Sequence, residues 1–261
     1  MYQKKNITWT ASANIAHNSN KVTSIGTDQK EIINTNQTII RVGQPLGTYY
    51  GWIFDGVASY GDDLSKVPAP SNKTNVEYGD AKFKDINNDG VVDQENDRVI
   101  LGSVQPKFTY GFSSNLRYKD WDLSVNFQGS YGNKLYNQLE QALESPNASY
   151  NASSKLLDRW SPTNTDTSIP RAYALNLYSS YLDNRFIEDA SYLRLKNIQI
   201  GYLFKPRFDK TSKLNLYLYA SAQNLFTITK YSGFDPEYSN YVDRGVYPSS
   251  RTVTFGVKLS Y

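Results

Sequence analysis

The stretch Arg251-Thr-Val-Thr-Phe-Gly-Val-Lys-Leu-Ser-Tyr261 alternates without a fault between two kinds of side chain. Its odd positions from Val253 to Tyr261 are apolar, and its even positions from Thr252 to Ser260 are polar or glycine. Two residues is the side-chain period of a β-strand. The stretch therefore predicts a strand with one apolar and one polar face.

The same alternation predicts six further strands. In residues 192–204 the phase changes between Leu195 and Ile198, and a β-bulge near Lys196-Asn197 accounts for the change. At about 9–13 residues, the seven strands exceed the usual ~5–6 and match the ~9–11 that a tilted strand needs to cross a bilayer. The other five are residues 7–15, 46–54, 108–118, 121–127 and 214–222.

Composition excludes several classes of function. The 261 residues include no Cys and one His, so disulfides, thiolate metal sites, Cys nucleophiles and imidazole clusters are excluded. A net charge of +3 without a long basic run argues against nucleic-acid binding. No run of ~18 apolar residues occurs, which excludes a transmembrane helix but not transmembrane strands. The first residues lack the apolar segment of a signal peptide, so we expect the chain to begin inside a fold.

The predicted connections differ strongly in length. Residues 117–120 and 205–213 are short turns, whereas 55–106, 132–190 and 227–250 are long. Short periplasmic turns and long extracellular loops are typical of outer-membrane barrels. If the last strand ends in the periplasm, the direction of each earlier strand follows from it. The long connections then lie outside, and residues 18–44 form a longer inner connection. We expect short helices at residues 137–143 and 154–160 in the outer loops.

Two architectures fit this pattern. One is part of an antiparallel transmembrane β-barrel, because bacterial single-chain barrels have an even number of strands and seven predict a fragment. The alternative is a soluble or surface-anchored β-sandwich that binds glycan, with one face of each strand packed inward. A hydrolase lacks a recognisable nucleophile motif, although a pair of carboxylates suffices for a glycosidase.

Six motifs, taken in order and spacing, then favour the barrel. They are Leu46-Gly-Thr-Tyr-Tyr-Gly-Trp-Ile-Phe-Asp-Gly56; Asp85-Ile-Asn-Asn-Asp-Gly90 with Ile100-Leu-Gly-Ser103 and Pro106; Phe127-Gln-Gly-Ser-Tyr-Gly-Asn133; Arg159-Trp-Ser-Pro-Thr-Asn164 with Ile169-Pro-Arg171; Ala190-Ser-Tyr-Leu-Arg-Leu-Lys-Asn197; and Asn224-Leu-Phe-Thr-Ile-Thr-Lys-Tyr-Ser-Gly-Phe-Asp-Pro-Glu237. Over nearly its whole length the chain resembles the C-terminal part of SusC/RagA-type TonB-linked outer-membrane proteins of the Bacteroidetes.

The resemblance implies an all-β fold and a transport function without catalysis. Residues 1–261 would supply about seven C-terminal strands of a barrel of about 22 strands with a plugged lumen, and the signal peptide, plug and early strands would be absent. Members of the family import oligosaccharides or peptides across the outer membrane, powered by TonB and capped by a SusD-like lipoprotein. The implied contact with TonB lies in the missing N-terminal part, and the implied surroundings are outer-membrane lipid.

One segment carries the chemistry of a metal site. Residues 85–93 match the opening of a calcium loop of the EF-hand type, in which oxygen ligands stand at positions 1, 3, 5 and 9 and glycine at position 6. Position 12 is Asn96 where the bidentate Glu is expected, and the flanking residues predict extended segments rather than helices. The alternative is an Asx-rich turn held by side-chain to backbone hydrogen bonds. The predicted Ca²⁺ ligands are Asp85, Asn87, Asp89, the Val91 carbonyl and Asp93, with Asp97 as a further candidate.

Other residues predict less specific roles. Three tryptophans, Trp9, Trp52 and Trp121, suit the interfacial girdles of a barrel, or plain strand packing. His17 has no partner motif, and Asp235-Pro236-Glu237 predicts a turn rather than a carboxylate pair. Tyrosines in the outer loops could meet substrate, the lipoprotein lid or their own loops. They are Tyr173, Tyr178, Tyr181, Tyr231, Tyr238, Tyr241 and Tyr247.

Overall fold

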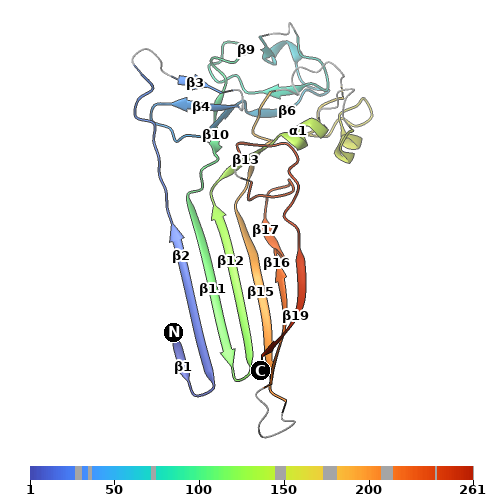
Figure 1. Ribbon diagram of the computed structural model, residues 1–261. Coiled ribbons are helices and arrows are strands. Elements are labelled where there is room, and N and C mark those ends of the chain that lie inside the picture. Colours follow the sequence, from blue (N-terminus) through green and yellow to red (C-terminus); the bar gives the residue numbers. More distant parts are fainter. Residues whose placement is uncertain are drawn as a thin grey trace.

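One long antiparallel sheet, which we call the wall, dominates the computed structural model (Figure 1). The structure describes residues 1–26, 31–34, 37–71, 75–144, 151–172, 181–206, 214–238 and 240–260. The wall follows the order β1 (Tyr2–Lys4), β2 (Ile7–Ala16), β11 (Phe108–Tyr118), β12 (Trp121–Tyr131), β15 (Tyr192–Phe204), β16 (Asn215–Gln223) and β19 (Thr252–Ser260), and β17 (Thr227–Thr229) pairs with the upper part of β15. The expected all-β, antiparallel architecture is confirmed.

The register of the wall places like side chains side by side. Phe112 of β11 lies opposite Ala13 of β2 and Phe127 of β12, while Ser113 lies opposite Ser12 and Asn126. Between β12 and β15 the register shifts, because Asn126 pairs with Asn197 whereas Phe127 pairs with Leu195. Lys196 is therefore the extra residue of a β-bulge, which confirms the bulge that the change of phase predicts.

The predicted wall strand at residues 46–54 is wrong. Its residues divide between β5 (Thr48–Gly51) and β6 (Phe54–Val57), and neither belongs to the wall. All four residues of β5 are buried, so this segment has no exposed face for lipid. The main path of the wall nevertheless contains seven strands, because β1 pairs with β2 across a tight turn and takes the place of the missing strand in the count.

The loss of that strand changes the expected topology. Residues 17–107 form one connection between β2 and β11, and it lies at the same end of the wall as the other two long connections (Figure 1). The expectation that residues 18–44 form an inner connection is therefore wrong. The short connections between paired strands lie at the opposite end, which we call the turn end.

The described residues of the three long connections, 17–107, 132–191 and 224–251, fold into small sheets that we call the cap. The sheets are β10 (Val99–Ser103), β5, β4 (Thr38–Arg41) and β3 (Glu31–Ile33); β14 (Ile187–Asp189), β13 (Lys134–Asn137) and β18 (Val242–Asp243); β6 with β8 (Ala81–Phe83); and β7 (Ala69–Pro70) with β9 (Val91–Val92). The expected helices occur as α1 (Gln138–Glu144) and the 3₁₀ helix η2 (Ser154–Asp158), beside a second 3₁₀ helix, η1 (Leu64–Lys66).

The buried core lies in the cap rather than in the wall. Its largest cluster joins side chains from two of the small sheets and the loop before β14, namely Tyr49, Tyr136, Leu182, Phe186, Ile187 and Val242. No helix among the described residues is both long and apolar enough to cross a membrane.

Candidate functional site: the polar face of the wall and the cap above it

One face of the wall is almost entirely apolar and lies open. Phe255 is 80% exposed and Val257 65%, and no second sheet of the described chain covers them. In a β-sandwich this face would be buried against a partner sheet. The sandwich alternative is therefore wrong, and the arrangement fits strands whose apolar side chains face lipid.

Aromatic side chains mark both ends of this apolar face. Near the turn end, Trp9 pairs with Leu116, and the rings of Trp121 and Tyr202 are 4.6 Å apart. Near the cap, the rings of Phe108 and Tyr131 stack at 5.0 Å. Strands of 11 residues, at a rise of ~3.3 Å and tilted by ~40°, span about 25–28 Å, the height of the apolar band of a transmembrane barrel.

The tryptophans divide between the two regions. Trp9 and Trp121 lie half-exposed at the turn end, as the girdle prediction requires. Trp52 is only 4% exposed and lies in the cap, where its ring stacks on Tyr181 at 4.4 Å and its Nε1 donates to the Asp93 carbonyl. The girdle prediction is therefore wrong for Trp52.

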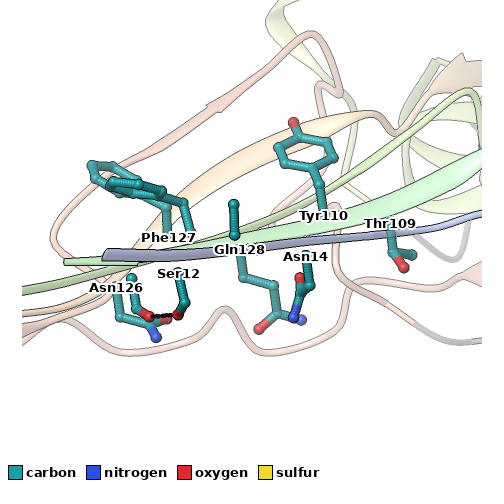
Figure 2. A pocket seen from close by; sticks show the side chains of 11 residues that line it. Ser12, Asn14, Thr109, Tyr110, Asn126, Phe127 and Gln128 are labelled. Carbon is teal, nitrogen blue, oxygen red and sulfur yellow. Dashed lines mark hydrogen bonds between the residues drawn. The ribbon is translucent and has the colours of Figure 1, made fainter. Parts of the chain in front are cut away.

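The opposite face of the wall carries hydroxyl and amide groups. Figure 2 shows Ser12, Asn14, Thr109, Asn126 and Gln128 on one side of the sheet, with Tyr110 and Phe127 on the other. The polar side chains Ser12, Asn14, Thr109, Asn126 and Gln128 are among those that line a hollow of about 430 Å³.

Hydrogen bonds between neighbouring strands organise this polar face. The hydroxyls of Ser12 and Ser113 are 2.7 Å apart, and Ser124 donates to Asn115 at 2.7 Å. The face can therefore offer neutral donors and acceptors to water or to a polar solute.

Arg194 fastens the cap to the wall. Its side chain is 4% exposed, and its guanidinium donates to Asp235 at 2.6 Å and to Glu237 at 2.5 Å. Lys196, the bulge residue, also donates to Glu237, at 2.6 Å. Burial raises the pKa of Asp235, but hydrogen bonds from Arg194 and Ser249 lower it by more, so that its pKa is about 2.

This cluster was not predicted from the sequence. The Asp235-Pro236-Glu237 segment does form a turn, in which the Glu237 N–H donates to Asp235 at 3.0 Å, as expected. Its two carboxylates, however, are the acceptors for Arg194 and Lys196. The available signal was the pair of charges two residues apart at an otherwise apolar strand end.

A second polar cluster joins helix α1 to the rest of the cap. The Ser232 hydroxyl lies 2.8 Å from a carboxylate oxygen of both Glu140 and Glu188, and Lys155 pairs with Glu140. Burial raises the pKa of Glu140, but bonds to Lys155, Glu188 and Ser232 lower it by more, to about 2. Burial and the neighbouring Glu140 raise the pKa of Glu188.

The predicted calcium ligands lie together on one tight turn. Asp85 accepts the N–H of Asn88 at 2.6 Å and of Gly90 at 2.7 Å, and the turn needs the positive φ of Gly90, +88°. Asp89 accepts the N–H of Val91 at 2.9 Å. Extended segments rather than helices flank the turn, as expected: β8 precedes it, and β9 and β10 follow.

The last predicted ligand has a distinct place. The fully buried Asp97 accepts the N–H of Ile86 and of Asp93, each at 2.7 Å, and so joins the two ends of the turn. The N–H of Asn96 lowers the pKa of Asp93. Within the described ranges no three His, Cys, Asp or Glu side chains converge as a metal group. Calcium binding stays a prediction.

The loop tyrosines have divergent environments. Tyr231 is buried and donates to Asp243 at 2.6 Å, whereas Tyr247 is 89% exposed. Tyr173 and Tyr178 lie outside the described residues. His17 lies exposed where β2 ends, with its ring nitrogen at the Lys107 carbonyl. Tyr241 is also exposed, at 37%. Among the loop tyrosines that the structure describes, Tyr241 and Tyr247 are therefore the ones open to a partner.

A sheet with one lipid-facing and one polar face defines the wall of a transmembrane β-barrel, here open at β1–β2 and β19. Comparison with known proteins refines this class. The chain is 32% identical, over 98% of its length, to the TonB-dependent receptor P3 of Formosa agariphila, and 26% identical to the TonB-dependent receptor SusC of Bacteroides thetaiotaomicron. No protein-family model matches it.

Solved structures agree with the sequence matches. The structure of the RagAB peptide transporter superposes on this chain with a TM-score of 0.77 at 26% sequence identity. The match covers the whole of this chain and 28% of the transporter chain. The chain spans about a quarter of the relatives, 27% of P3 and 25% of SusC. The resemblance to SusC/RagA-type TonB-dependent receptors is confirmed along the entire chain, which corresponds to part of their barrel. The relatives are named as receptors and transporters.

Proposed function

We propose that the chain forms part of the wall of an outer-membrane importer that takes up oligosaccharides or peptides in a Bacteroidetes-like bacterium. The observation that carries this proposal is the two-faced wall, whose apolar side matches a bilayer and whose polar side offers hydroxyl and amide groups. Neighbouring strands of the wall are hydrogen-bonded to one another, as hydrocarbon surroundings demand of a polar backbone.

The cap supplies the side on which partners would dock. A SusD-like lipoprotein is the proposed partner there, because exposed aromatics such as Phe234 and Tyr247 stand out from an otherwise folded cap. TonB is the proposed energy source, with its contact outside this chain. RagAB is named a peptide transporter, which supports peptides as one of the two substrate classes.

Labelling of single cysteines tests the membrane placement. The chain has no Cys, so Val125→Cys and Asn126→Cys each give one thiol, on adjacent residues and opposite faces of β12. In outer membranes we expect Asn126→Cys to react with a water-soluble maleimide and Val125→Cys to resist it. Equal reactivity of the two thiols would overturn the proposal.

Transport itself is tested in cells. A strain without the gene should lose uptake of one oligosaccharide or peptide class and regain it with the gene, and loss of TonB should have the same effect. Uptake that continues without the gene in every substrate tested would contradict the import function. Co-purification of the neighbouring lipoprotein with the tagged receptor tests the partner.

We propose separately that the turn of residues 85–97 binds Ca²⁺. Oxygen ligands crowd one exposed turn, and close carboxylates repel one another unless a cation lies between them. Calorimetry of the intact protein should detect Ca²⁺ uptake in the millimolar range or below, and Asp89→Asn should weaken it about tenfold. No heat of binding at millimolar Ca²⁺ would leave an Asx-rich turn.

A further inference from the structure

The turn end of the wall is held in one piece by backbone hydrogen bonds. Lys119, in the turn between β11 and β12, donates its N–H to the Asn6 carbonyl in the turn between β1 and β2, at 2.8 Å. On the other side of the same turn, Leu203 of β15 donates to the Asp120 carbonyl at 2.8 Å. Side chains on these neighbouring segments therefore keep fixed relative positions.

Positive charge gathers at this fixed rim. A hollow of about 700 Å³ is lined by five cations, Lys4, Lys5, Arg117, Lys119 and Lys205, and by a single acidic residue, Asp120. Asp120 is paired with Lys205 at 2.7 Å. The other four cations are exposed, and within the described part of the chain they form no ion pair. Their charge is available to an external anion.

These cations lie at the level of the aromatic row of the turn end. Lys119 Nζ is 5.3 Å from the centre of the Tyr118 ring, and Tyr118 pairs with Trp121 on the apolar face. Lys4 pairs with Ile7, two residues along β1 from the pair of Tyr2 with Trp9 across the β1–β2 hairpin. Exposed Trp and Tyr side chains of this kind mark the boundary between acyl chains and headgroups. The ammonium groups therefore reach the headgroup layer.

We propose that the turn end binds the phosphodiester headgroups of anionic phospholipids. The inference rests on the proposed placement of the wall in a membrane. Lysines at a membrane surface attract anionic lipid, and their long stems pack on apolar side chains while the charge stays in water. Because Lys4, Lys5 and Lys119 sit beside the lipid-facing aromatics, the favoured anion is one whose acyl chains lie against that face.

The test compares lipid retention by two variants of equal charge. The protein is inserted into vesicles of phosphatidylcholine with and without phosphatidylglycerol and then extracted in mild detergent, and mass spectrometry counts the lipids that remain bound. The turn-end variant is Lys4→Gln/Lys5→Gln/Lys119→Gln. The control variant, Lys21→Gln/Lys84→Gln/Lys107→Gln, removes three exposed lysines from the cap.

We expect the parent protein and the control to retain phosphatidylglycerol in preference to phosphatidylcholine, and the turn-end variant to lose that preference by about tenfold. Equal retention of both lipids by the parent, or equal loss in the two variants, would overturn the inference alone. An acidic protein is the alternative occupant of this basic rim. A turn-end variant that still retains phosphatidylglycerol but no longer binds an acidic protein would also overturn the inference. Failure of the parent to insert into either vesicle would overturn the membrane placement and the inference together.

Discussion

Strands β12 of the wall and β5 of the cap come from sequences that both appear strand-like and end in opposite environments. Residues 121–131 alternate between apolar side chains or glycine and polar side chains. Residues 48–54, in contrast, are Thr-Tyr-Tyr-Gly-Trp-Ile-Phe, with hardly a polar residue. The first pattern suits a strand with two different faces, and the second suits a strand buried on both. The comparison teaches that the polar positions, more than the apolar ones, identify a membrane strand.

The energetic basis of the two regions differs accordingly. The cap has buried side-chain clusters, and ion pairs such as Arg194 with Asp235 join it to the wall. The wall has inter-strand hydrogen bonds and a face that is stabilised only when lipid covers it. Substitutions can therefore separate the two regions.

Arg194→Met should have the largest effect, because it leaves Asp235 and Glu237 without their shared guanidinium. We expect a loss of about 3–5 kcal/mol in the stability of the cap. Limited proteolysis of residues 230–250 in detergent would measure it. Lys66→Met, which breaks the exposed pair with Asp63, is the control and should cost less than about 1 kcal/mol. Equal protease resistance of the two variants would contradict a fastening role for Arg194.

Val125→Lys should come next and should act on the wall alone. A lysine at the middle of the lipid face costs about 2–4 kcal/mol, so we expect poor assembly and a lower urea midpoint in lipid. Asn126→Lys, one residue away on the polar face, should assemble normally. The comparison between the faces fails if the two variants assemble equally well.

Gly51→Ala should destabilise the cap by about 1–3 kcal/mol. An added Cβ would lie 2.3 Å from the Leu182 carbonyl oxygen, which belongs to a backbone that cannot yield. The matched variant in the wall is Gly111→Ala, whose Cβ meets the movable end of Asn14 at 2.7 Å. Thermal unfolding in detergent should show a clear loss for the first variant and little for the second.

Acid should weaken the fastening of the cap by about 2 kcal/mol. The pKa of Asp235 is about 2 in the folded protein, below its ordinary value of 3.8, so its contribution is complete above about pH 4 and is lost as the pH falls toward 2. Pepsin cleavage of residues 230–250 across this range would follow the loss. In Asp235→Asn the cleavage rate should be higher throughout and nearly independent of pH. A parallel slope in both proteins would assign the effect to another group.

Period-two patterning predicts the wall well, because each wall strand has two chemically different faces. It even locates the bulge, since one extra residue at Lys196 must shift the phase. The prediction of a wall strand at 46–54 is wrong because this segment is apolar on both sides, so that its alternation does not mark two different faces.

The cap clusters could not be predicted in the same way. Arg194 and Asp235 are 41 residues apart, and nothing in their spacing indicates contact. The turn of residues 85–97 is an intermediate case. Its shape follows from local Asx and glycine preferences, but the role of Asp97 in joining both ends depends on burial that the sequence does not encode locally.

The bulge at Lys196 also gives β15 an unusual tolerance of length. In most strands the loss of one residue would exchange the two faces beyond it. Here, without Lys196, Leu195 would directly precede Asn197, and the alternation of Leu193, Arg194, Leu195, Asn197 and Ile198 would become regular. Related chains can therefore gain or lose this residue without turning the strand over, and the extra position adds a second cation beside Glu237.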